Sequence, residues 1–242
     1  MRKPVIYFFP PATLPNATVS VTIVPQWTFT HVYPLVAAKR VEDGRQEISW
    51  TVAAEPDGTL MDKATGLELS YLFWEATGRC APPPSPPLLP IDGTLSPETE
   101  RFDPGAPSLS PDSPTAVLLS FAELLPYLDS VLRALAFHTA ARNDFITYWL
   151  PALSRKPYVA LRFLPQAVYE RAAELRVEPR PDVVTRAMML FRSVGEGEVL
   201  LWADARRRVA TVHWAAVVGV RASEAQDTSL FRVLEWGAIE VL

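Results

Sequence analysis

Two pairs of neighbouring tryptophan and glutamate residues have the clearest potential for chemistry in this chain of 242 residues: Trp74-Glu75 and Glu235-Trp236. Both glutamates lie in segments too apolar for routine exposure to water. A carboxyl in such surroundings has its charged form disfavoured, and the raised pKa that follows is what a general acid near neutral pH requires. If the two carboxyls face each other across a cleft, they form a pair for acid/base hydrolysis of the kind that glycosidases use.

The alternative for the same two carboxylates is a structural role. Each glutamate would then pair with an arginine, and Arg186 and Arg162 are the candidates because they lie on apolar segments. Burying such a pair costs roughly several kcal/mol per ion unless the geometry is good. We favour the structural pairing, and we keep Glu75 and Glu235 as candidate catalytic residues with Arg186 in support.

Asp144 and Tyr148 form a second candidate group, because residues four apart lie on the same face of a helix. Such a pair can orient a hydroxyl or an amine of a ligand, or it can anchor its helix to a sheet, and the anchoring role is the favoured one. The seven Trp and seven Tyr residues could line a pocket for a sugar or an aromatic ligand. Most of them fall in predicted strands, which favours a place in the core.

Other catalytic signatures are weak in the sequence. The single cysteine, Cys80, excludes an intramolecular disulfide and a zinc site built on several cysteines, and no histidine is near it in the sequence to act as a base. His31, His138 and His213 do not have the spacing of metal ligands. We expect His31 and His213 in strands and His138 at the end of a helix, where the macrodipole favours a cation. The sequence therefore predicts no metal and no cofactor.

Charge and hydropathy narrow the set of partners. A net charge of −4 and a pI near 5.5 argue against binding to nucleic acid, and we interpret Arg206-Arg207-Arg208 as a solvated turn. The apolar run from Val5 to Phe9 ends at Pro10-Pro11 and is shorter than an export signal (about 7–15 residues) or a membrane helix (about 20). The expectation is a soluble, cytoplasmic protein with neither nucleic acid nor membrane as a partner.

The first 80 residues are predicted to form strands. Apolar and polar residues alternate over 19–23 and 48–54, as a half-buried strand requires, and Pro56-Asp57-Gly58 predicts a hairpin turn into 59–61. Residues 67–75 are predicted to form one strand that is covered on both sides. One face of that strand would carry Leu67, Leu69, Tyr71 and Phe73.

Helices and further strands are predicted after residue 114. The first helix runs from Glu123 to Phe137 with Pro126 in its first turn, and the second runs from Ala140 to Leu150, capped by Thr139 and ended before Pro151. The segment 166–175 is a further helix candidate. Strands are predicted at 158–164, 183–191, 199–202, 209–220 and 231–242. The fold class is α+β, β-rich, with inserted helices.

Proline is concentrated in one segment. Residues 81–114 contain 11 of the 24 prolines and few aliphatic side chains, so we expect a flexible, disordered insertion with little to bury. Polyproline segments dock on aromatic grooves of partner proteins, but Pro-Pro tracts also occur in ordinary connecting loops, which is the favoured interpretation.

Residues 3–10, KPVIYFFP, resemble the KPVIYLYP-like element that opens a group of largely uncharacterised microbial and fungal proteins. The resemblance covers nearly the whole chain, which implies a single domain over residues 1–242 that the insertion at 81–114 interrupts. It implies no particular activity. The chain departs from the group at Phe8-Phe9 and at Ala238, and the insertion looks peculiar to this sequence. The other stretches similar to the group are 70–75, 144–151, 181–183 with Arg186, and 233–237.

Two functions from different classes follow from these observations. The first is an intracellular binding or interaction protein for an unidentified protein or small-molecule ligand, because the sequence has no evident catalytic motif. The second is a cofactor-independent hydrolase or lyase. It would use Glu75 and Glu235 for acid/base chemistry, with Asp144, Tyr148 and Arg186 in support.

Overall fold

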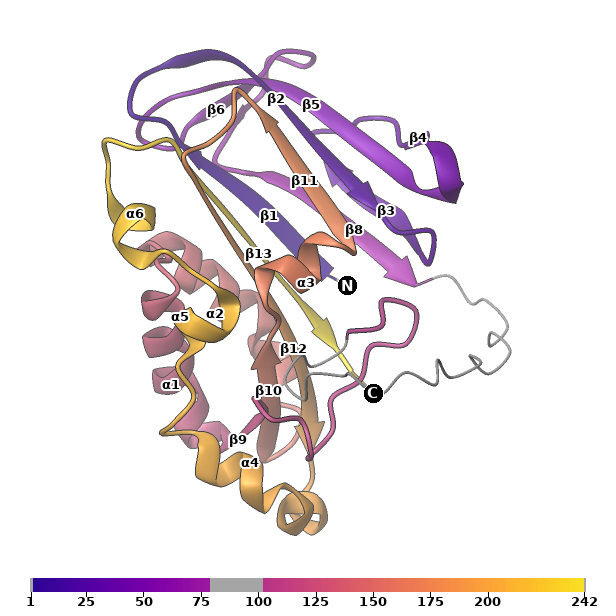
Figure 1. Cartoon of the computed structure of the whole chain (residues 1–242), viewed down its shortest axis with the longest axis vertical. Coiled ribbons are helices and arrows are strands. Elements are labelled where there is room, and N and C mark those ends of the chain that lie inside the picture. The colour runs from indigo at the N-terminus through magenta and orange to yellow at the C-terminus, as the bar shows by residue number, and fades with distance from the viewer. Residues whose placement is uncertain (1, 79–101, 242) are drawn as a thin grey trace, which may run out of the picture.

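The sheets and helices of the chain are arranged in three layers (Figure 1). The computed structural model describes residues 2–78 and 102–241. A six-stranded sheet packs against one face of a seven-stranded sheet, and helices cover the other face. The prediction of a β-rich α+β fold is confirmed.

The seven-stranded sheet is the central layer. Its strands β12 and β13 pair in parallel, and the other strand pairs described in it are antiparallel. The apolar run Val5 to Phe9 forms most of β1, whose side chains are buried alternately toward the helices (Val5, Tyr7) and toward the six-stranded sheet (Ile6, Phe8). In spatial order the strands are β3 (Trp27–Tyr33), β8 (Leu72–Gly78), β1 (Arg2–Phe9), β13 (Arg232–Glu240), β12 (Val183–Val194), β10 (Tyr158–Phe163) and β9 (Val117–Ser120).

The six-stranded sheet follows the predicted alternation. In β5, Ile48 and Trp50 are buried while Ser49 is exposed. The predicted hairpin turn is present, because the Thr59 backbone N–H donates to Asp57 Oδ1 at 2.8 Å. In spatial order the strands of the six-stranded sheet are β11 (Ala173–Glu178), β2 (Leu14–Ile23), β5 (Gln46–Ala54), β6 (Leu60–Asp62) and β7 (Glu68–Leu69), with β4 (Lys39–Arg40) paired to β5.

The prediction of one strand over residues 67–75 is wrong. The chain forms β7 in the six-stranded sheet, leaves it at Ser70, and forms β8 in the seven-stranded sheet. Leu67 is exposed and Leu69 faces the core between the sheets, whereas Tyr71 and Phe73 face the helices. A pattern of period two is the same on both sides of the crossing, so it does not mark where a chain changes sheets.

The helices lie mainly after residue 120. Helix α1 begins two residues earlier than predicted, so Pro126 lies in its second turn rather than its first. The Ser120 backbone N–H and hydroxyl both donate to Glu123 Oε2, at 3.1 and 2.6 Å, which stabilises the earlier start. The helices are η1 (Glu42–Gly44), α1 (Phe121–Ala134), α2 (Thr139–Leu153), α3 (Gln166–Glu170), η2 (Glu196–Trp202), α4 (Ala203–Arg208), α5 (Trp214–Val218) and α6 (Ala222–Gln226).

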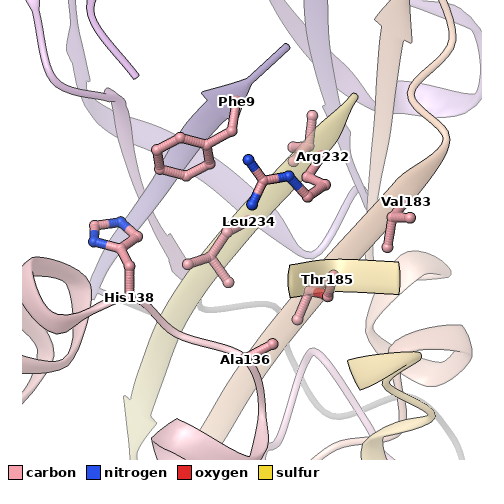
Figure 2. A pocket seen from close by; sticks show the side chains of 9 residues that line it. Phe9, Ala136, His138, Val183, Thr185, Arg232 and Leu234 are labelled. Carbon is pink, nitrogen blue, oxygen red and sulfur yellow. The ribbon is translucent and has the colours of Figure 1, made fainter. Parts of the chain in front are cut away.

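His138 caps the N-terminus of α2, where the sequence predicted Thr139 as the cap. Its Nδ1 accepts the Ala141 backbone N–H at 3.3 Å. His138 lies on the turn between α1 and α2, and its ring packs beside the ring of Phe9 from β1 (Figure 2). The prediction that His138 ends a helix at the negative pole of its dipole is therefore wrong. At its other end α2 continues through Pro151 to Leu153.

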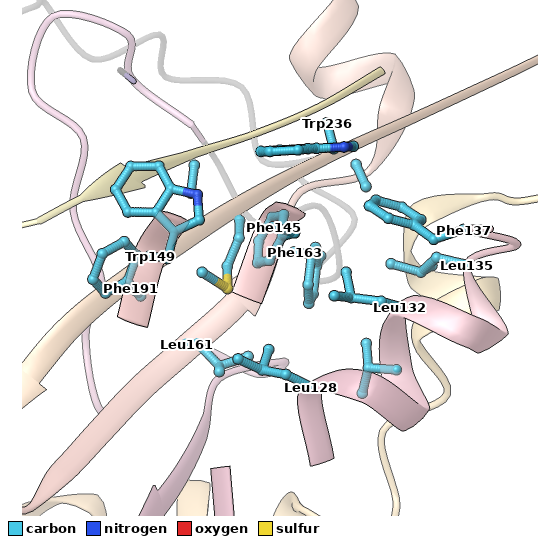
Figure 3. Packing of buried hydrophobic residues seen from close by; sticks show 14 of the residues in the cluster. Leu128, Leu132, Leu135, Phe137, Phe145, Trp149, Leu161, Phe163, Phe191 and Trp236 are labelled. Atoms are coloured by element: carbon cyan, nitrogen blue, oxygen red, sulfur yellow. The ribbon is translucent and has the colours of Figure 1, made fainter. Parts of the chain in front are cut away.

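The core between the helices and the seven-stranded sheet is rich in aromatic rings. Figure 3 shows Phe145 of α2 beside Trp236 of β13, and their ring centroids are 5.2 Å apart at 66°. Trp149 makes a similar edge contact with Phe191 at 5.2 Å. Both α2 residues lie on the buried face that also carries Ala141, so the helix is held by this aromatic packing.

Two of the predicted strands, 199–202 and 209–220, are helical or irregular. Residues 199–202 belong to η2, and 209–220 contain α5, so His213 precedes a helix rather than lying in a strand. Arg206 to Arg208 end helix α4 and do not form the expected turn. Trp214 and Val218 are buried in the core on the helix side, and Trp202 is buried in a separate cluster with Leu118 and Ala160 on the other face of the sheet. Such packing decides between helix and strand for short apolar runs.

The structure describes only the last part of the predicted proline-rich insertion, 81–114. Residues 79–101 lie outside the described part of the chain, but 102–114 have defined contacts. Leu109 is buried, the Trp27 indole N–H donates to the Pro104 carbonyl at 2.8 Å, and the Arg208 guanidinium donates to the Ser113 carbonyl at 2.9 Å. These contacts tie residues 102–114 to β3 and α4, because Trp27 and Arg208 donate to carbonyls that proline leaves without strand partners.

Candidate functional site

The five predicted site residues fall on opposite faces of the seven-stranded sheet. Side chains alternate along a strand, and Trp74 and Glu235 face the six-stranded sheet, whereas Glu75 and Trp236 face the helices. The catalytic alternative, in which Glu75 and Glu235 face each other across a cleft, therefore does not fit the geometry. The structure instead brings Glu75 together with Asp144 and Tyr148, and it brings Glu235 together with Arg186.

Glu235 is fully buried in a closed ion pair between the two sheets. Its Oε2 accepts Arg186 Nε at 2.5 Å, and its Oε1 accepts the Trp74 indole N–H at 3.1 Å and the Tyr169 hydroxyl at 3.5 Å. The structural alternative is confirmed for this glutamate. Both of its oxygens accept hydrogen bonds, and the side chain has no exposed surface through which a substrate could reach it.

Arg186 extends the same network toward the six-stranded sheet. Its Nη1 group donates to the Glu170 carboxylate and, at 2.6 Å, to the Ala173 carbonyl. The centre of its guanidinium lies 4.3 Å from the centroid of the Tyr169 ring. Burial opposes the charged form, but the attraction of Glu235 and Glu170 outweighs it and raises the pKa of Arg186. Through Arg186 the cluster therefore links β12 of the seven-stranded sheet to β11 of the six-stranded sheet.

On the helix face, Glu75 joins three other elements to β8. Its Oε1 accepts the Lys3 backbone N–H and the Tyr148 hydroxyl, each at 3.2 Å, and its Oε2 lies 3.2 Å from His31 Nδ1. These groups come from β1, α2 and β3, and Arg162, the other predicted partner, lies on β10. The Glu75 carboxylate is thus held by polar groups rather than by an arginine.

Asp144 on α2 is hydrogen-bonded to β1. Its Oδ2 accepts the Tyr7 hydroxyl at 3.1 Å. Burial, then the negative charge of Asp144 and the hydrogen bond to it, raise the pKa of Tyr7 well above its ordinary value. Tyr7 therefore remains a protonated donor throughout the physiological pH range, and it anchors α2 to the sheet as the sequence analysis favoured for this helix.

The Lys3 ammonium lies among aromatic rings. Its Nζ is 4.7 Å from the ring centroid of Tyr148, 5.5 Å from that of Trp236 and 5.9 Å from that of Tyr71. Burial lowers the pKa of Lys3, and the nearby negative charge of Asp144 partly offsets this effect. Cation–π attraction, rather than a salt bridge within the described residues, therefore holds the amine.

An irregular backbone brings Lys3 to this position. Its φ of +49° lies in the left-handed region, which is unusual for a residue with a side chain, and the register of β1 against β13 shifts between Arg2 and Val5. Pro4 packs closely on Gly237, where an added Cβ would lie 3.2 Å from Pro4 Cγ and 3.0 Å from Met188 Cε. The small residue at 237 thus makes room for the bulge that presents Lys3.

A cavity of about 450 Å³ opens beside this group, where the chain crosses from β7 to β8. We call it the Lys3 cavity. Four aromatic side chains and three polar ones provide most of its wall. They are Lys3, Tyr33, Glu68, Leu69, Ser70, Tyr71, Phe73 and Tyr148.

Of the five predicted residues, Tyr148 alone lines this cavity, and Glu75 and Asp144 support it from behind. The sequence analysis did not single out Lys3, Tyr7 or Tyr71, because their meeting depends on pairing between strands far apart in the sequence. A signal for them was available, since all three lie in stretches that carry the resemblance to the KPVIYLYP-like group.

Within residues 2–78 and 102–241, no group of three or more His, Cys, Asp or Glu is arranged to hold a metal ion. No helix in this part of the chain is both long and apolar enough to cross a membrane. Comparison with protein-family models, with curated proteins and with solved structures finds no match. The resemblance to the KPVIYLYP-like group therefore stays a prediction.

Proposed function

We propose that this protein binds a small, neutral ligand that has a ring and several hydroxyl groups, such as a saccharide, in the Lys3 cavity. The observation that carries the proposal is the combination of an aromatic wall with polar groups at its edge. As part of the same proposal we place this binding in the cytoplasm, which the single cysteine favours.

The aromatic wall supports a ligand with a flat apolar face. Tyr33 and Tyr148 expose 48% and 37% of their surface, so both large rings leave apolar area in contact with water that a ligand could cover. Tyr71 and Phe73 continue the wall inward. Rings of this kind provide a large contact area at low entropic cost.

The charge balance supports a neutral ligand. The Lys3 ammonium already has three rings and the nearby Asp144, and Glu75 already has three donors. The lining carries one positive side chain, Lys3, and one negative side chain, Glu68, so its net charge is zero and favours neither an anion nor a cation. Hydroxyl groups, by contrast, can donate to the exposed Glu68 carboxylate and exchange hydrogen bonds with Ser70.

A hydrolase or lyase that pairs Glu75 with Glu235 receives no support from the geometry. The two carboxylates point to opposite faces of the sheet, and both oxygens of the buried Glu235 accept hydrogen bonds within the protein. A protein partner that docks on the proline-rich segment stays a prediction, because most of that segment lies outside the described residues.

Saturation-transfer NMR with phenyl glucoside as the probe tests the proposal, with choline and benzoate as charged comparators. We expect phenyl glucoside to bind better than either ion. Tyr148→Ala should weaken its binding about tenfold, equivalent to about 1.4 kcal/mol. Tyr148→Phe keeps the ring and should weaken it less.

Two outcomes would contradict the proposal. One is an absence of saturation transfer to phenyl glucoside in the wild-type chain. The other is equal binding by the wild type, Tyr148→Ala and Tyr33→Ala, with the fold of each variant checked by its amide NMR spectrum. A preference for choline or benzoate would contradict the neutral character of the ligand.

A further inference from the structure

A second, smaller cavity lies at the other end of β1, and it shares no lining residue with the Lys3 cavity. Its volume is about 80 Å³, which suits a small polar group and not a ring. Phe9 and Arg232 form its sheet side as directly paired residues of β1 and β13, and the turn between α1 and α2 covers it with Ala136 and His138 (Figure 2).

Arg232 brings an unbalanced positive charge to this cavity. Its guanidinium lies 5.4 Å from the centroid of the Phe9 ring, and its Nε makes a long hydrogen bond of 3.4 Å to the Leu230 carbonyl. It forms no salt bridge within the described part of the chain. Burial lowers the pKa of Arg232, and the attraction of Asp227 offsets only part of that effect. A partly buried cation in this state attracts an anion.

His138 brings an unused hydrogen-bond donor to the same cavity. Because its Nδ1 accepts the Ala141 N–H, the neutral ring carries its hydrogen on Nε2. Burial lowers the pKa of His138, with further lowering by Arg142 and Arg232 and an opposing effect of Asp144, so the neutral form is favoured. Nε2 is buried and has no hydrogen-bond partner among residues 2–78 and 102–241.

Other groups around the cavity also favour an anion that accepts hydrogen bonds. The cavity lies at the N-terminal end of the 15-residue helix α2, where the macrodipole favours negative charge. Thr185, buried at the start of β12, adds a hydroxyl to the lining. Ala136 has a φ of +63°, a strained value for alanine, in the turn that carries His138 over the cavity.

We infer that this cavity binds an oxyanion, either a carboxylate or a phosphate group, between the Arg232 guanidinium and the His138 imidazole. The planar fork of arginine matches both groups. Thr185, on the neighbouring strand β12, adds a hydroxyl from the sheet side, and His138 adds its Nε2–H from the turn that covers the cavity. Binding would neutralise the charge of Arg232 and provide an acceptor for Nε2. The inference does not rest on the function proposed for the Lys3 cavity.

NMR of the histidine side chains in the ¹⁵N-labelled full-length chain tests this inference. The probes are sodium phosphate and sodium acetate, each titrated at constant ionic strength against sodium chloride. The chain has three histidines, and His138→Asn identifies the His138 signal by its loss while keeping a residue that caps helices well. We expect one probe or both to shift the His138 Nε2 resonance with saturation, and the stronger probe identifies the ligand as a phosphate or a carboxylate.

Arginine variants make the test specific. Arg232→Gln should weaken probe binding by about tenfold or more, and Arg232→Lys, which keeps the charge without the fork, should weaken it less. Arg221→Gln is the matched control, because Arg221 lies nearby but pairs with Glu224 and the Asp182 carbonyl outside the cavity. It should leave binding unchanged.

Three outcomes would overturn the inference: no saturable shift of His138 with either probe, an equal response in the wild type and Arg232→Lys and Arg232→Gln, or an equal loss in Arg221→Gln. The second and third would indicate general screening of surface charge. Amide spectra of all variants establish that each is folded, and Arg232→Lys keeps the test open if Arg232→Gln does not fold.

Discussion

Glu75 and Glu235 each stand next to a tryptophan in the sequence and have opposite surroundings in the fold. Glu235 lies between the sheets with no exposed surface, and an arginine balances its charge. Glu75 lies on the helix face with 17% of its side chain exposed, and a tyrosine hydroxyl, a backbone N–H and a histidine contact it. Glu235 balances the arginine that reaches the six-stranded sheet, and Glu75 supports two residues that line the Lys3 cavity.

The difference arises because successive side chains of a strand lie on opposite faces of the sheet. Within Trp74-Glu75 the tryptophan faces the six-stranded sheet, and within Glu235-Trp236 the glutamate does. Because the register of the sheet puts Trp74 and Glu235 on the same face, their neighbours Glu75 and Trp236 lie on the other face. A buried charge needs a charged partner, whereas a carboxylate near water can be satisfied by neutral donors.

The largest expected effect is at Glu235. Glu235→Gln removes the charge that balances the buried Arg186, so we expect the free energy of unfolding to fall by about 3–5 kcal/mol in urea denaturation. Glu240→Gln is the control, since it removes only the partly exposed pair with Arg155 and should cost less than about 1 kcal/mol. A loss below about 1 kcal/mol for Glu235→Gln would show that the ion pair does not hold the sheets together.

A paired substitution sharpens the same point. Glu235→Leu combined with Arg186→Met replaces the ion pair with apolar side chains of similar size. We expect this double variant to be more stable than Glu235→Gln, because it leaves no buried charge without its partner. An equally unstable double variant would indicate that shape, rather than charge balance, is decisive at this position.

A smaller effect is expected at Tyr7. Tyr7→Phe leaves Asp144 without a donor that a buried hydroxyl provided, and we expect the free energy of unfolding to fall by about 1.5 kcal/mol. Tyr148→Phe removes a more exposed hydroxyl from Glu75 and should cost less. Urea denaturation of both variants tests this order, and a larger loss for Tyr148→Phe would contradict it.

A pH dependence is expected from His138. Its pKa is lowered in the folded chain, so the unfolded chain binds the proton more readily. The contribution to stability is full above the unfolded pKa of about 6.5 and is lost as the pH falls toward the folded pKa. Because the side chain is partly exposed, we expect a decline below about 1 kcal/mol.

The groups around His138 set the control for this pH dependence. Asp144 and Arg142 face the imidazole from α2, Arg232 from β13 and Tyr7 from β1. His138→Asn removes the titrating group and should flatten the stability curve between pH 7.5 and about 5.5 relative to the wild type. An unchanged curve would assign the decline to other groups.

The smallest stability effect is expected at Glu75. Gln at this position can still accept the Lys3 N–H and the Tyr148 hydroxyl, so Glu75→Gln should change the free energy of unfolding by no more than about 0.5 kcal/mol. A loss comparable to that of Glu235→Gln would remove the contrast between the two carboxylates. Urea denaturation of the two variants side by side makes this comparison.

Much of the fold could be predicted where one local pattern decides the outcome. The alternation over 48–54, the turn at Asp57 and the apolar face of α1 gave the right elements. Prediction failed at 199–202 and 209–220, where short apolar runs fit a strand or a helix and the packing of Trp202 and Trp214 decided for helix.

The candidate site was predicted only in part for a similar reason. Asp144 and Tyr148 share a helix face, so their proximity follows from spacing alone, and both lie at the site. Lys3 and Tyr71 come from strands that pair through long-range contacts, and no local pattern joins them. The predicted partnership of Glu75 with Glu235 failed because the faces of two strands cannot be related until their register is known.

By itself, the sequence determined which residues alternate along each strand, where α1 and α2 place their apolar faces, and that Glu235 would require a partner if buried. Only the tertiary structure decided that β8 and β13 flank β1 with Glu75 and Glu235 on opposite faces, that Lys3 lies among three rings, and that Arg232 meets His138. The physical reason is that periodicity is a local property of the backbone, whereas strand order and register are fixed by burial of the whole core.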